Sequence, residues 1–184
     1  MTPFFLTPQN SALLVVDIQE RLMNVIHNRQ QVIDNTILLL KTAHVLKMPI
    51  LSTTQYAARI GNFPASIKAE LPETPIDKME FSCFGSQDFV KSLDNLSPVV
   101  RSFIICGVET HICIYQTALD GLLAGYRMLV PADAVSSRTT DNYQSGLQRI
   151  QQIGGEIINT EMVIYELLKK AGTNEFKTLL PLLK

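Results

Sequence analysis

The chain has 184 residues, of which 46% are hydrophobic and 18% charged, and its formal net charge is −1. This composition is typical of a globular domain. The near-neutral balance gives no electrostatic basis for binding nucleic acid or an anionic membrane, and no apolar run reaches the ~20 residues that a spanning helix needs. Three irregularly spaced cysteines predict free thiols, and without a basic segment at the start of the chain we expect a cytoplasmic protein.

The first half of the chain predicts two buried strands, a helix and a long loop. Residues 12–16 form a continuous apolar run that ends at Asp17, as in a strand buried on both faces. Residues 28–46 carry apolar side chains at helical spacing, and residues 49–54 predict a second strand. Residues 56–75 contain one glycine and three prolines and predict a long loop, which in a compact domain is usually functional.

The second half repeats the alternation of strands and helices. Residues 76–81 predict a short strand, and Ser86 is the expected N-cap of a helix over 86–96. The strands expected after it are 101–108, 126–130 and 156–158, and the expected helices are 111–125, 139–152, 160–170 and 174–183.

This alternation predicts a three-layer α/β/α fold, doubly wound around a mostly parallel, six-stranded sheet, in a single domain of residues 1–184. In such folds ligands bind beyond the carboxyl ends of the strands. The candidate positions are therefore Asp17, residues 52–56, residues 109–113 and Asp133.

The segment GVETHIC places a thiol at the start of a predicted helix. With Thr110 as the N-cap, Cys113 is the third helical residue, where unpaired N–H groups and the helix dipole stabilise a thiolate and an oxyanion. The alternative is that Cys113 is a small buried apolar residue, and its position alone does not decide between the two. Cys83 and Cys106 are expected to be structural.

A nucleophilic thiol needs a group that accepts its proton. Asp17 is the first candidate, although an aspartate at the end of a strand is often a turn or cap residue. Lys78 is the candidate third member, because an ammonium beside both groups favours their charged forms, but a lone lysine is more often a surface residue; the competing base is His111. His111 faces about 100° away from Cys113 on a helix and is expected at the pocket rim or capping the turn.

Three motifs together, LLVVDIQ, DKMEFSCF and ICGVETHICI, resemble those of the isochorismatase-like cysteine hydrolase superfamily, especially its small single-domain members. The resemblance implies a Rossmann-like fold with Asp17 as general base, Lys78 as electrostatic partner and Cys113 as nucleophile. It also implies a cis peptide between Val108 and Glu109, with an oxyanion hole made by the N–H groups of Glu109 and Cys113. The residues that fall where the family has pocket walls are Gln19, Gln55, Tyr56 and Phe84.

The nicotinamidases of this superfamily bind a metal through an Asp-x-His pair and further histidines, whereas this chain has no histidine between His44 and His111. We therefore expect no metal, no cofactor and no efficient nicotinamidase activity. The expected function is cysteine-dependent hydrolysis of a small amide, ureido or similar C–N bond. The alternatives are vinyl-ether hydrolysis of isochorismate with Asp17 as general acid, and a non-catalytic interaction protein. The segment FKTLLPLLK carries more leucine than a free tail should expose, so it packs either on its own domain or on a neighbouring copy. The oligomers common in the family that the chain resembles favour a homo-oligomer.

Overall fold

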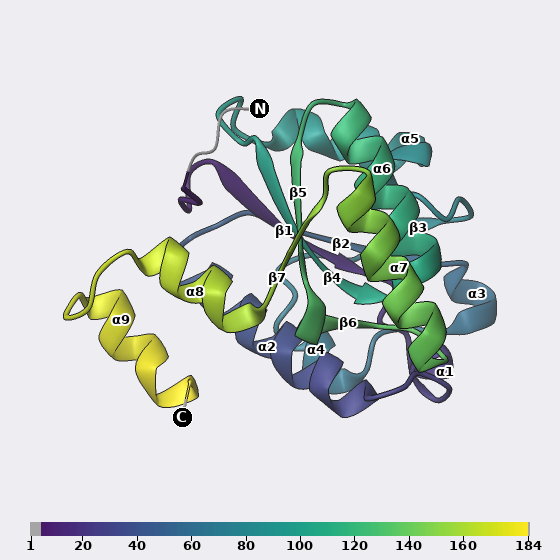
Figure 1. Cartoon of the computed structure of the whole chain (residues 1–184), viewed down its shortest axis with the longest axis horizontal. Helices are drawn as coiled ribbons and strands as arrows, with labels where there is room; N and C mark the ends of the chain where they lie inside the picture. The colour runs from purple at the N-terminus through teal and green to yellow at the C-terminus, as the bar shows by residue number, and fades with distance from the viewer. Residues whose placement is uncertain (1–4, 184) are drawn as a thin grey trace.

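The computed structural model describes residues 5–183, so residues 1–4 and 184 of the expected domain lie outside the described part. Its strands form one parallel sheet in the order β3-β2-β1-β4-β5-β7, with β6 paired to the end of β4 (Figure 1). The strands are β1 (Ser11–Val16), β2 (Ile50–Gln55), β3 (Ile76–Lys78), β4 (Ser102–Val108), β5 (Arg127–Pro131), β6 (Val135–Ser136) and β7 (Glu156–Ile158).

Helices cover both faces of this sheet (Figure 1). One layer contains α2 (Arg29–Val45), α4 (Ala65–Lys68), α8 (Thr160–Leu168) and α9 (Asn174–Leu179); the other contains α5 (Gln87–Ser92), α6 (Tyr115–Leu123) and α7 (Thr140–Gln152). The remaining helical segments are α1 (Glu20–Met23), α3 (Ala57–Ile60), the π-helical turn η3 (Thr110–Ile114) and the 3-10 turns η1 (Cys83–Gly85), η2 (Leu93–Asn95), η4 (Ala132–Ala134) and η5 (Leu180–Leu182).

The apolar run of β1 alternates between two hydrophobic cores. Leu13 and Val15 pack in the core beneath α2, whereas Leu14 and Val16 pack in the core that also contains residues of α5 and α6. Side chains that alternate on a strand covered on both faces must all be apolar, which explains why the sequence pattern is continuous.

The predicted fold class is confirmed, with local differences in the number and length of elements. Among residues 5–183 the sheet has seven strands rather than six, because the two-residue β6 is too short to produce a periodic pattern. The expected loop 56–75 contains α3 and α4, each only one turn long, and the equally short α1 follows β1 without having been predicted.

The order of strands reverses between β1 and β4, so the carboxyl ends of these two central strands form a crevice edge where ligands bind in such sheets. Gly107, near the end of β4, has φ +125°, and a Cβ there would lie 2.0 Å from the carbonyl oxygen of Val16. Only glycine permits this close approach, which sets the end of β4 directly against the end of β1.

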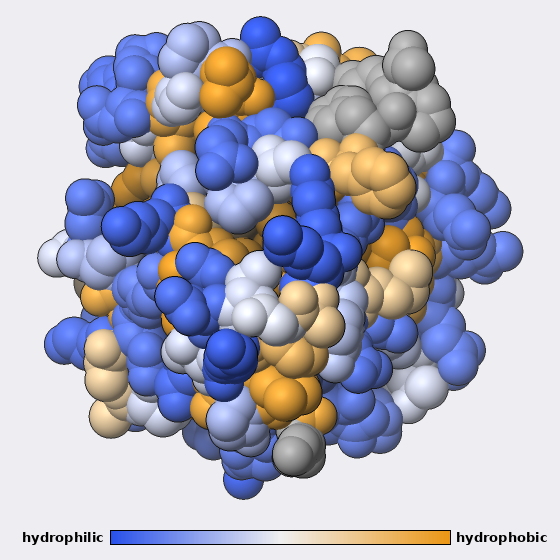
Figure 2. Space-filling model, turned by 90° about the vertical axis from the view of Figure 1, so that its left-hand side faces the viewer, coloured by the Kyte–Doolittle hydropathy of each residue, from blue (hydrophilic) through white to orange (hydrophobic). Residues whose placement is uncertain are grey.

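The leucine-rich C-terminal segment packs largely on its own molecule. Leu179 is fully buried in a small cluster with Ile164 and Leu168 of α8, while Leu182 is 42% exposed. Figure 2 views the side of the molecule on the left of Figure 1 and shows apolar groups scattered among hydrophilic ones. Within residues 5–183, none of the helices combines the length and apolarity required to cross a bilayer.

Candidate active site

Asp17 begins the site, directly after β1. Its backbone is left-handed, with φ 53°, which aspartate tolerates better than most residues, and its side chain is completely buried. The Thr53 hydroxyl, from the neighbouring β2, donates a hydrogen bond of 2.9 Å to Asp17 Oδ1. The Lys78 ammonium donates one of 2.6 Å to Asp17 Oδ2. Both oxygens of the carboxylate are thus held, one by a partner from the adjacent β2 and the other by a partner from β3, the next strand beyond it.

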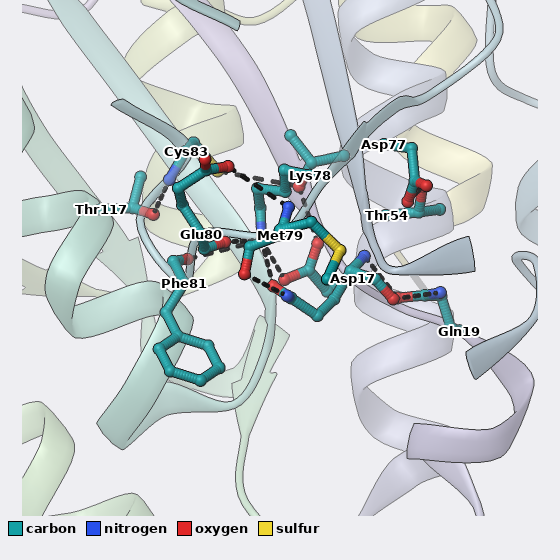
Figure 3. Close-up of polar contacts among 12 residues, drawn as sticks. Asp17, Gln19, Thr54, Asp77, Lys78, Met79, Glu80, Phe81, Cys83 and Thr117 are labelled. Atoms are coloured by element: carbon teal, nitrogen blue, oxygen red, sulfur yellow. Dashed lines mark hydrogen bonds and ion pairs between the residues drawn. The ribbon is translucent and has the colours of Figure 1, made fainter. Parts of the chain in front are cut away.

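Lys78 ends the edge strand β3, and it is buried rather than at the surface. Besides Asp17, its Nζ lies 3.0 Å from Gln55 Oε1, 3.3 Å from the Glu80 carbonyl oxygen and 3.4 Å from the Phe81 carbonyl oxygen. Figure 3 shows the chain after β3 folding around the lysine so that these carbonyl groups face it. A buried charge persists only when it is paired and hydrogen-bonded, and this ammonium is both.

Cys113 lies buried in the elbow after β4, close enough to Asp17 and Lys78 for both charges to shift the pKa of its thiol. The peptide bond between Val108 and Glu109, for which the resemblance implies the cis form, is cis. Glu109, not Thr110 as predicted, is the N-cap, because the helix begins one residue earlier as a π-helical turn. The Thr110 hydroxyl is buried without a hydrogen-bond partner, so it does not cap the turn.

The π-helical turn changes the hydrogen bonding around the thiol. The Glu109 carbonyl accepts the N–H groups of Ile112 (3.0 Å) and Ile114 (3.2 Å), the residues on either side of Cys113. In a regular α-helix this carbonyl would accept from Cys113 itself. Such single π turns recur at functional sites because they redirect backbone groups.

The electrostatic environment favours the neutral thiol form of Cys113, opposite to the stabilisation expected from the helix dipole alone. Burial raises the pKa of Cys113 far above its ordinary value, and the negative charge of Asp17 raises it further, while Lys78 lowers it by less. A stabilised thiolate would require the reverse balance. The arrangement therefore holds a neutral S–H beside a carboxylate that can accept its proton.

Burial and pairing act in opposite directions on the ion pair. Burial raises the pKa of Asp17, and the charge and hydrogen bonds of Lys78 and Thr53 only partly compensate, so the pKa stays above its ordinary value. For Lys78, burial alone would lower the pKa, but the adjacent Asp17 charge raises it above its ordinary value. Lys78 therefore stays charged, and Asp17 gains affinity for a proton.

A second ion pair holds the elbow in place. The Arg138 guanidinium donates to both carboxylate oxygens of Glu109, at 2.6 and 3.0 Å, and the Arg138 backbone N–H donates to the same group at 2.9 Å. Burial alone would raise the pKa of Glu109, but these hydrogen bonds and the charge of Arg138 bring it below the ordinary value. His111 is half-buried and its Nδ1 lies 3.0 Å from the hydroxyl of Ser137, the residue before Arg138, so it lies beside this ion pair.

A glycine brings α7 against the other side of the elbow. A Cβ on Gly146 would lie 2.8 Å from the backbone nitrogen of His111 and 2.9 Å from the carbonyl carbon of Thr110. Backbone atoms cannot move aside as a flexible side chain can. Gly146 therefore permits close packing of α7 on the backbone of Thr110 and His111, and any larger residue would push the two apart.

Of the four residues expected as pocket walls, two form a structural clamp. Gln19 is fully buried; it accepts the Gln55 N–H at 2.8 Å and donates to the carbonyl oxygens of Gln55 and Gly61 at 3.1 and 2.6 Å. Gln55 in turn accepts from Lys78 and donates to the Met79 carbonyl at 2.8 Å. These two side chains tie the ends of β1, β2 and β3 together.

The other two wall candidates differ from each other. Tyr56 is 39% exposed and has a left-handed backbone with φ 44°, a conformation that costs a bulky residue on the order of 1–3 kcal/mol. Phe84 is not brought to the site; its ring packs in an aromatic cluster with Phe89, Phe103 and Tyr126, which corrects the expectation. An aromatic side chain next to a motif cannot be assigned to pocket or core from spacing alone.

Two contacts of the site had no clear signal in the sequence. Thr53 fell within the suspected segment 52–56 but was not singled out, although a hydroxyl at the end of a strand beside Asp17 is a natural partner. Cys83 is fully buried as expected, yet its sulfur lies 3.7 Å from the Thr53 hydroxyl, and its N–H donates to Thr117, one turn after Cys113 (Figure 3). Burial raises the pKa of Cys83 to about 11, so it is a neutral thiol.

The structure thus gathers a carboxylate, an ammonium and a thiol from β1, β3 and the elbow after β4. Such a set can transfer the thiol proton to the carboxylate while sulfur attacks an electrophilic carbon. Asp133, another strand-end candidate, instead caps α8 by accepting the N–H and hydroxyl of Thr160. Within residues 5–183, His, Cys, Asp and Glu side chains do not form a group of three or more arranged to hold a metal ion.

Comparison with known proteins gives a consistent result. Residues 11–162 match the model of the isochorismatase domain. The secreted isochorismatase effector Isc1 of Phytophthora sojae is 37% identical over 183 residues, which cover 97% of this chain and 87% of that protein. The structure of the MAR1 ribonuclease from Caenorhabditis elegans is 31% identical, with a TM-score of 0.89, and the match covers 97% of this chain and 92% of that chain.

A more distant structure shares the fold. The YcaC gene product of Escherichia coli, described as an octameric hydrolase of unknown specificity, is 24% identical, with a TM-score of 0.89 over 99% of this chain and 92% of that chain.

Proposed function

Because the chain belongs to the isochorismatase family, we propose that it hydrolyses a small amide, ureido or similar C–N bond through the triad Asp17, Lys78 and Cys113. The observation that supports this proposal is the buried ion pair of Lys78 and Asp17, 2.6 Å apart, whose charges both act on the pKa of the nearby Cys113 thiol. Each group has the chemical type that its role requires.

In the first half of the reaction, Asp17 accepts the proton of the Cys113 thiol as sulfur attacks the substrate carbonyl carbon. The carbonyl oxygen becomes an oxyanion, which the N–H groups of Glu109 and Cys113 stabilise. The tetrahedral intermediate then collapses: the C–N bond breaks, the leaving nitrogen takes the proton from Asp17, and a thioester remains on Cys113.

In the second half, Asp17 accepts a proton from a water molecule that attacks the thioester carbonyl. The C–S bond breaks, the product leaves as a carboxylic or carbamic acid, and sulfur recovers its proton from Asp17. Lys78 keeps Asp17 in position and limits the rise of its pKa, so that the carboxylate is available as a base. All these roles are filled by side chains and backbone groups, so the proposal includes no metal and no cofactor.

A second candidate is hydrolysis of the vinyl ether of isochorismate, with Asp17 as general acid. The raised pKa of Asp17 favours this alternative, since burial makes the carboxyl group easier to protonate. The Lys78 ammonium opposes it, because a positive charge 2.6 Å away stabilises the carboxylate. A purely non-catalytic interaction protein is the third and least supported alternative, since such a protein needs no buried ion pair beside a thiol.

The expected partner is a small molecule rather than nucleic acid, and the expected location is the cytoplasm. Two named relatives differ from these expectations: one is described as a ribonuclease, which acts on nucleic acid, and another as a secreted effector. We also propose a homo-oligomer, in view of the octameric YcaC structure and the exposed side chains of Met162, Tyr165 and Leu182. Light scattering on the purified chain gives its assembly state directly.

The test compares Cys113→Ala and Asp17→Asn with the unaltered chain on a panel of small amides, ureido compounds and activated esters. Cys106→Ala is the matched control, because Cys106 is a buried thiol in the opposite core, beneath α2. We expect Cys113→Ala to lose about a thousandfold or more in kcat/KM, and Cys106→Ala to retain activity. Turnover that survives in both Cys113→Ala and Asp17→Asn would exclude this mechanism.

A further inference from the structure

Lys78, the ammonium in direct contact with Asp17, is already fully hydrogen-bonded, and large apolar side chains are exposed on the segments beside it. We propose that the substrate is an uncharged carbonyl compound with an apolar, preferably aromatic, group that packs on Tyr56, Met79 and Phe81. We call these three side chains the apolar rim. The proposal rests on the proposed function, since it describes the substrate of the same nucleophile.

The first argument is that Lys78 has no donor left for a substrate anion. An ammonium carries three protons, and four protein acceptors lie within 3.4 Å of Lys78 Nζ: Asp17, Gln55 and the carbonyl oxygens of Glu80 and Phe81. A substrate carboxylate in this site would lose its water without gaining a positive partner, which is unfavourable.

Two arginines on the segments that adjoin the site already have partners. The Arg138 guanidinium is held by both oxygens of Glu109, and the Arg21 guanidinium donates to the Arg59 carbonyl oxygen. Arg59 itself is an exposed cation on α3, one turn beyond Tyr56, where solvent screens its charge.

The second argument is the position of the apolar rim. The Tyr56 N–H donates to the Lys78 carbonyl at 2.9 Å, the Met79 carbonyl accepts from Gln55, and the Phe81 carbonyl faces Lys78 Nζ. Their side chains are nevertheless 39%, 62% and 52% exposed. In Figure 3 the ring of Phe81 extends away from the Asp17–Lys78 pair while its main chain stays beside it. Large apolar groups exposed beside a reactive centre are a surface for binding.

The third argument is the charge of the rim's neighbours. Glu80 lies between Met79 and Phe81, and its carboxylate accepts the Met79 N–H at 3.2 Å. Asp77 accepts from the Thr54 hydroxyl and the Ala57 N–H. Both carboxylates repel an anion, and both are engaged by the protein itself. Tyr56 also keeps a strained left-handed backbone that glycine would adopt freely, which is expected where the side chain has a role.

The test measures the rate at which Cys113 is alkylated by three probes that differ only in charge. They are N-benzyl-2-iodoacetamide and its analogues with a para carboxylate and a para aminomethyl group; in each, sulfur displaces iodide. Rates are divided by those for 2-mercaptoethanol at the same pH, and peptide mass spectrometry locates the adduct. We expect the neutral probe to react roughly tenfold faster than the anionic one, because a carboxylate must be desolvated without a partner.

The variants Met79→Ser and Phe81→Ser should remove most of this preference, whereas Leu123→Ser is the matched control, an exposed apolar residue at the end of α6. An anionic or cationic probe that reacts as fast as the neutral one would overturn the inference. If the anionic probe reacts faster, and Arg59→Gln abolishes that preference, Arg59 is the residue that binds the substrate anion. A change of assembly state in Phe81→Ser, seen by light scattering, would instead make the rim a subunit interface and also overturn it.

This outcome is separate from that of the proposed function. Alkylation requires the thiol and its surroundings but no turnover, so a neutral preference without Cys113-dependent hydrolysis would reject the hydrolase mechanism alone. Cys113-dependent hydrolysis without a neutral preference would reject the substrate class alone.

Discussion

Asp17 and Lys78 form a buried ion pair, with 2.6 Å between Oδ2 and Nζ and no solvent contact for either side chain. The pair joins the end of β1 to the end of β3 across the intervening β2. Its two charges act in opposite directions on the pKa of the neighbouring thiol, which burial already raises, and several predictions depend on this one contact.

The first prediction concerns the pH dependence of kcat/KM. As a general base, Asp17 must be ionised, and burial raises its pKa above 3.8, so activity should rise with pH along a limb centred above pH 3.8. Because the pKa of Lys78 is raised above 10.5, loss of its charge should not reduce activity until above pH 10.5. A profile that instead falls as Asp17 ionises would support the general-acid mechanism.

The second prediction is that Asp17→Asn makes the enzyme slower but the thiol more reactive. Removing the carboxylate deletes a charge that raises the pKa of Cys113 and leaves Lys78 beside it. Hydrolysis should fall by about 10²–10⁴-fold, while alkylation of Cys113 by iodoacetamide at pH 7 should quicken by about tenfold for each unit by which its pKa falls. Equal or slower alkylation in Asp17→Asn would contradict the electrostatic account. Cys113→Ser in the same background identifies the labelled residue.

The third prediction concerns the free energy of unfolding. Lys78→Met leaves a buried carboxylate without its partner and should cost about 3–5 kcal/mol, whereas the double variant Asp17→Asn/Lys78→Met should recover most of that loss. Asparagine also tolerates the left-handed backbone at position 17. Urea unfolding of Asp17→Asn, Lys78→Met and the double variant measures the loss and its recovery. If the two single effects simply add in the double variant, the two residues do not interact.

The same pair predicts how stability depends on alkaline pH. Since the pKa of Lys78 is higher in the folded chain than its ordinary 10.5, its contribution is complete below pH 10.5 and is lost as pH rises through the folded value. Unfolding midpoints measured from pH 9 upward should therefore fall more steeply for the unaltered chain than for Lys78→Met. Parallel curves would remove Lys78 as the cause.

The fourth prediction tests the packing of α7 on the elbow. Gly146→Ala places a methyl group against backbone atoms of Thr110 and His111, so it should shift the elbow and reduce kcat/KM as well as stability. Gly121→Ala is the matched control, because its methyl group meets mainly the flexible end of Met128 and lies in α6. Comparable activity losses in both variants would attribute the effect to general destabilisation.

The fifth prediction concerns RNA. With a net charge of −1, the chain lacks the excess of positive charge that neutralises phosphates, so we expect no RNA cleavage and no salt-dependent RNA binding. Incubation with labelled single-stranded RNA, with Cys113→Ala in parallel, checks this. Cleavage by the unaltered chain that disappears in Cys113→Ala would make it functionally close to the ribonuclease that it resembles in structure.

The sequence predicted the parts of the molecule that local patterns determine. Continuous apolar runs and helical spacing gave the fold, and the rule that ligands lie beyond the carboxyl ends of strands, joined to the family motifs, brought Asp17, Lys78 and Cys113 together. The stabilisation of a thiolate expected from the helix dipole and Lys78 is opposed by burial and the Asp17 charge, which only the packed structure reveals. Phe84 packs with Phe89, five residues later, and with Phe103, and spacing alone does not show whether such a ring joins the core or a pocket wall.

The Gln19 clamp has a consequence for how such proteins diverge. The Gln19 side chain, buried just after β1, hydrogen-bonds the backbone of Gln55 at the end of β2 and the backbone of Gly61. Its partners at Gln55 and Gly61 are main-chain groups on either side of residues 56–60, so the side chains of that short segment, Tyr56 among them, can differ without loosening the anchorage. Diversification of specificity in this architecture is thus decoupled from the inherited chemistry, and transplanting residues 56–60 between homologues should alter selectivity without rebuilding the reactive centre.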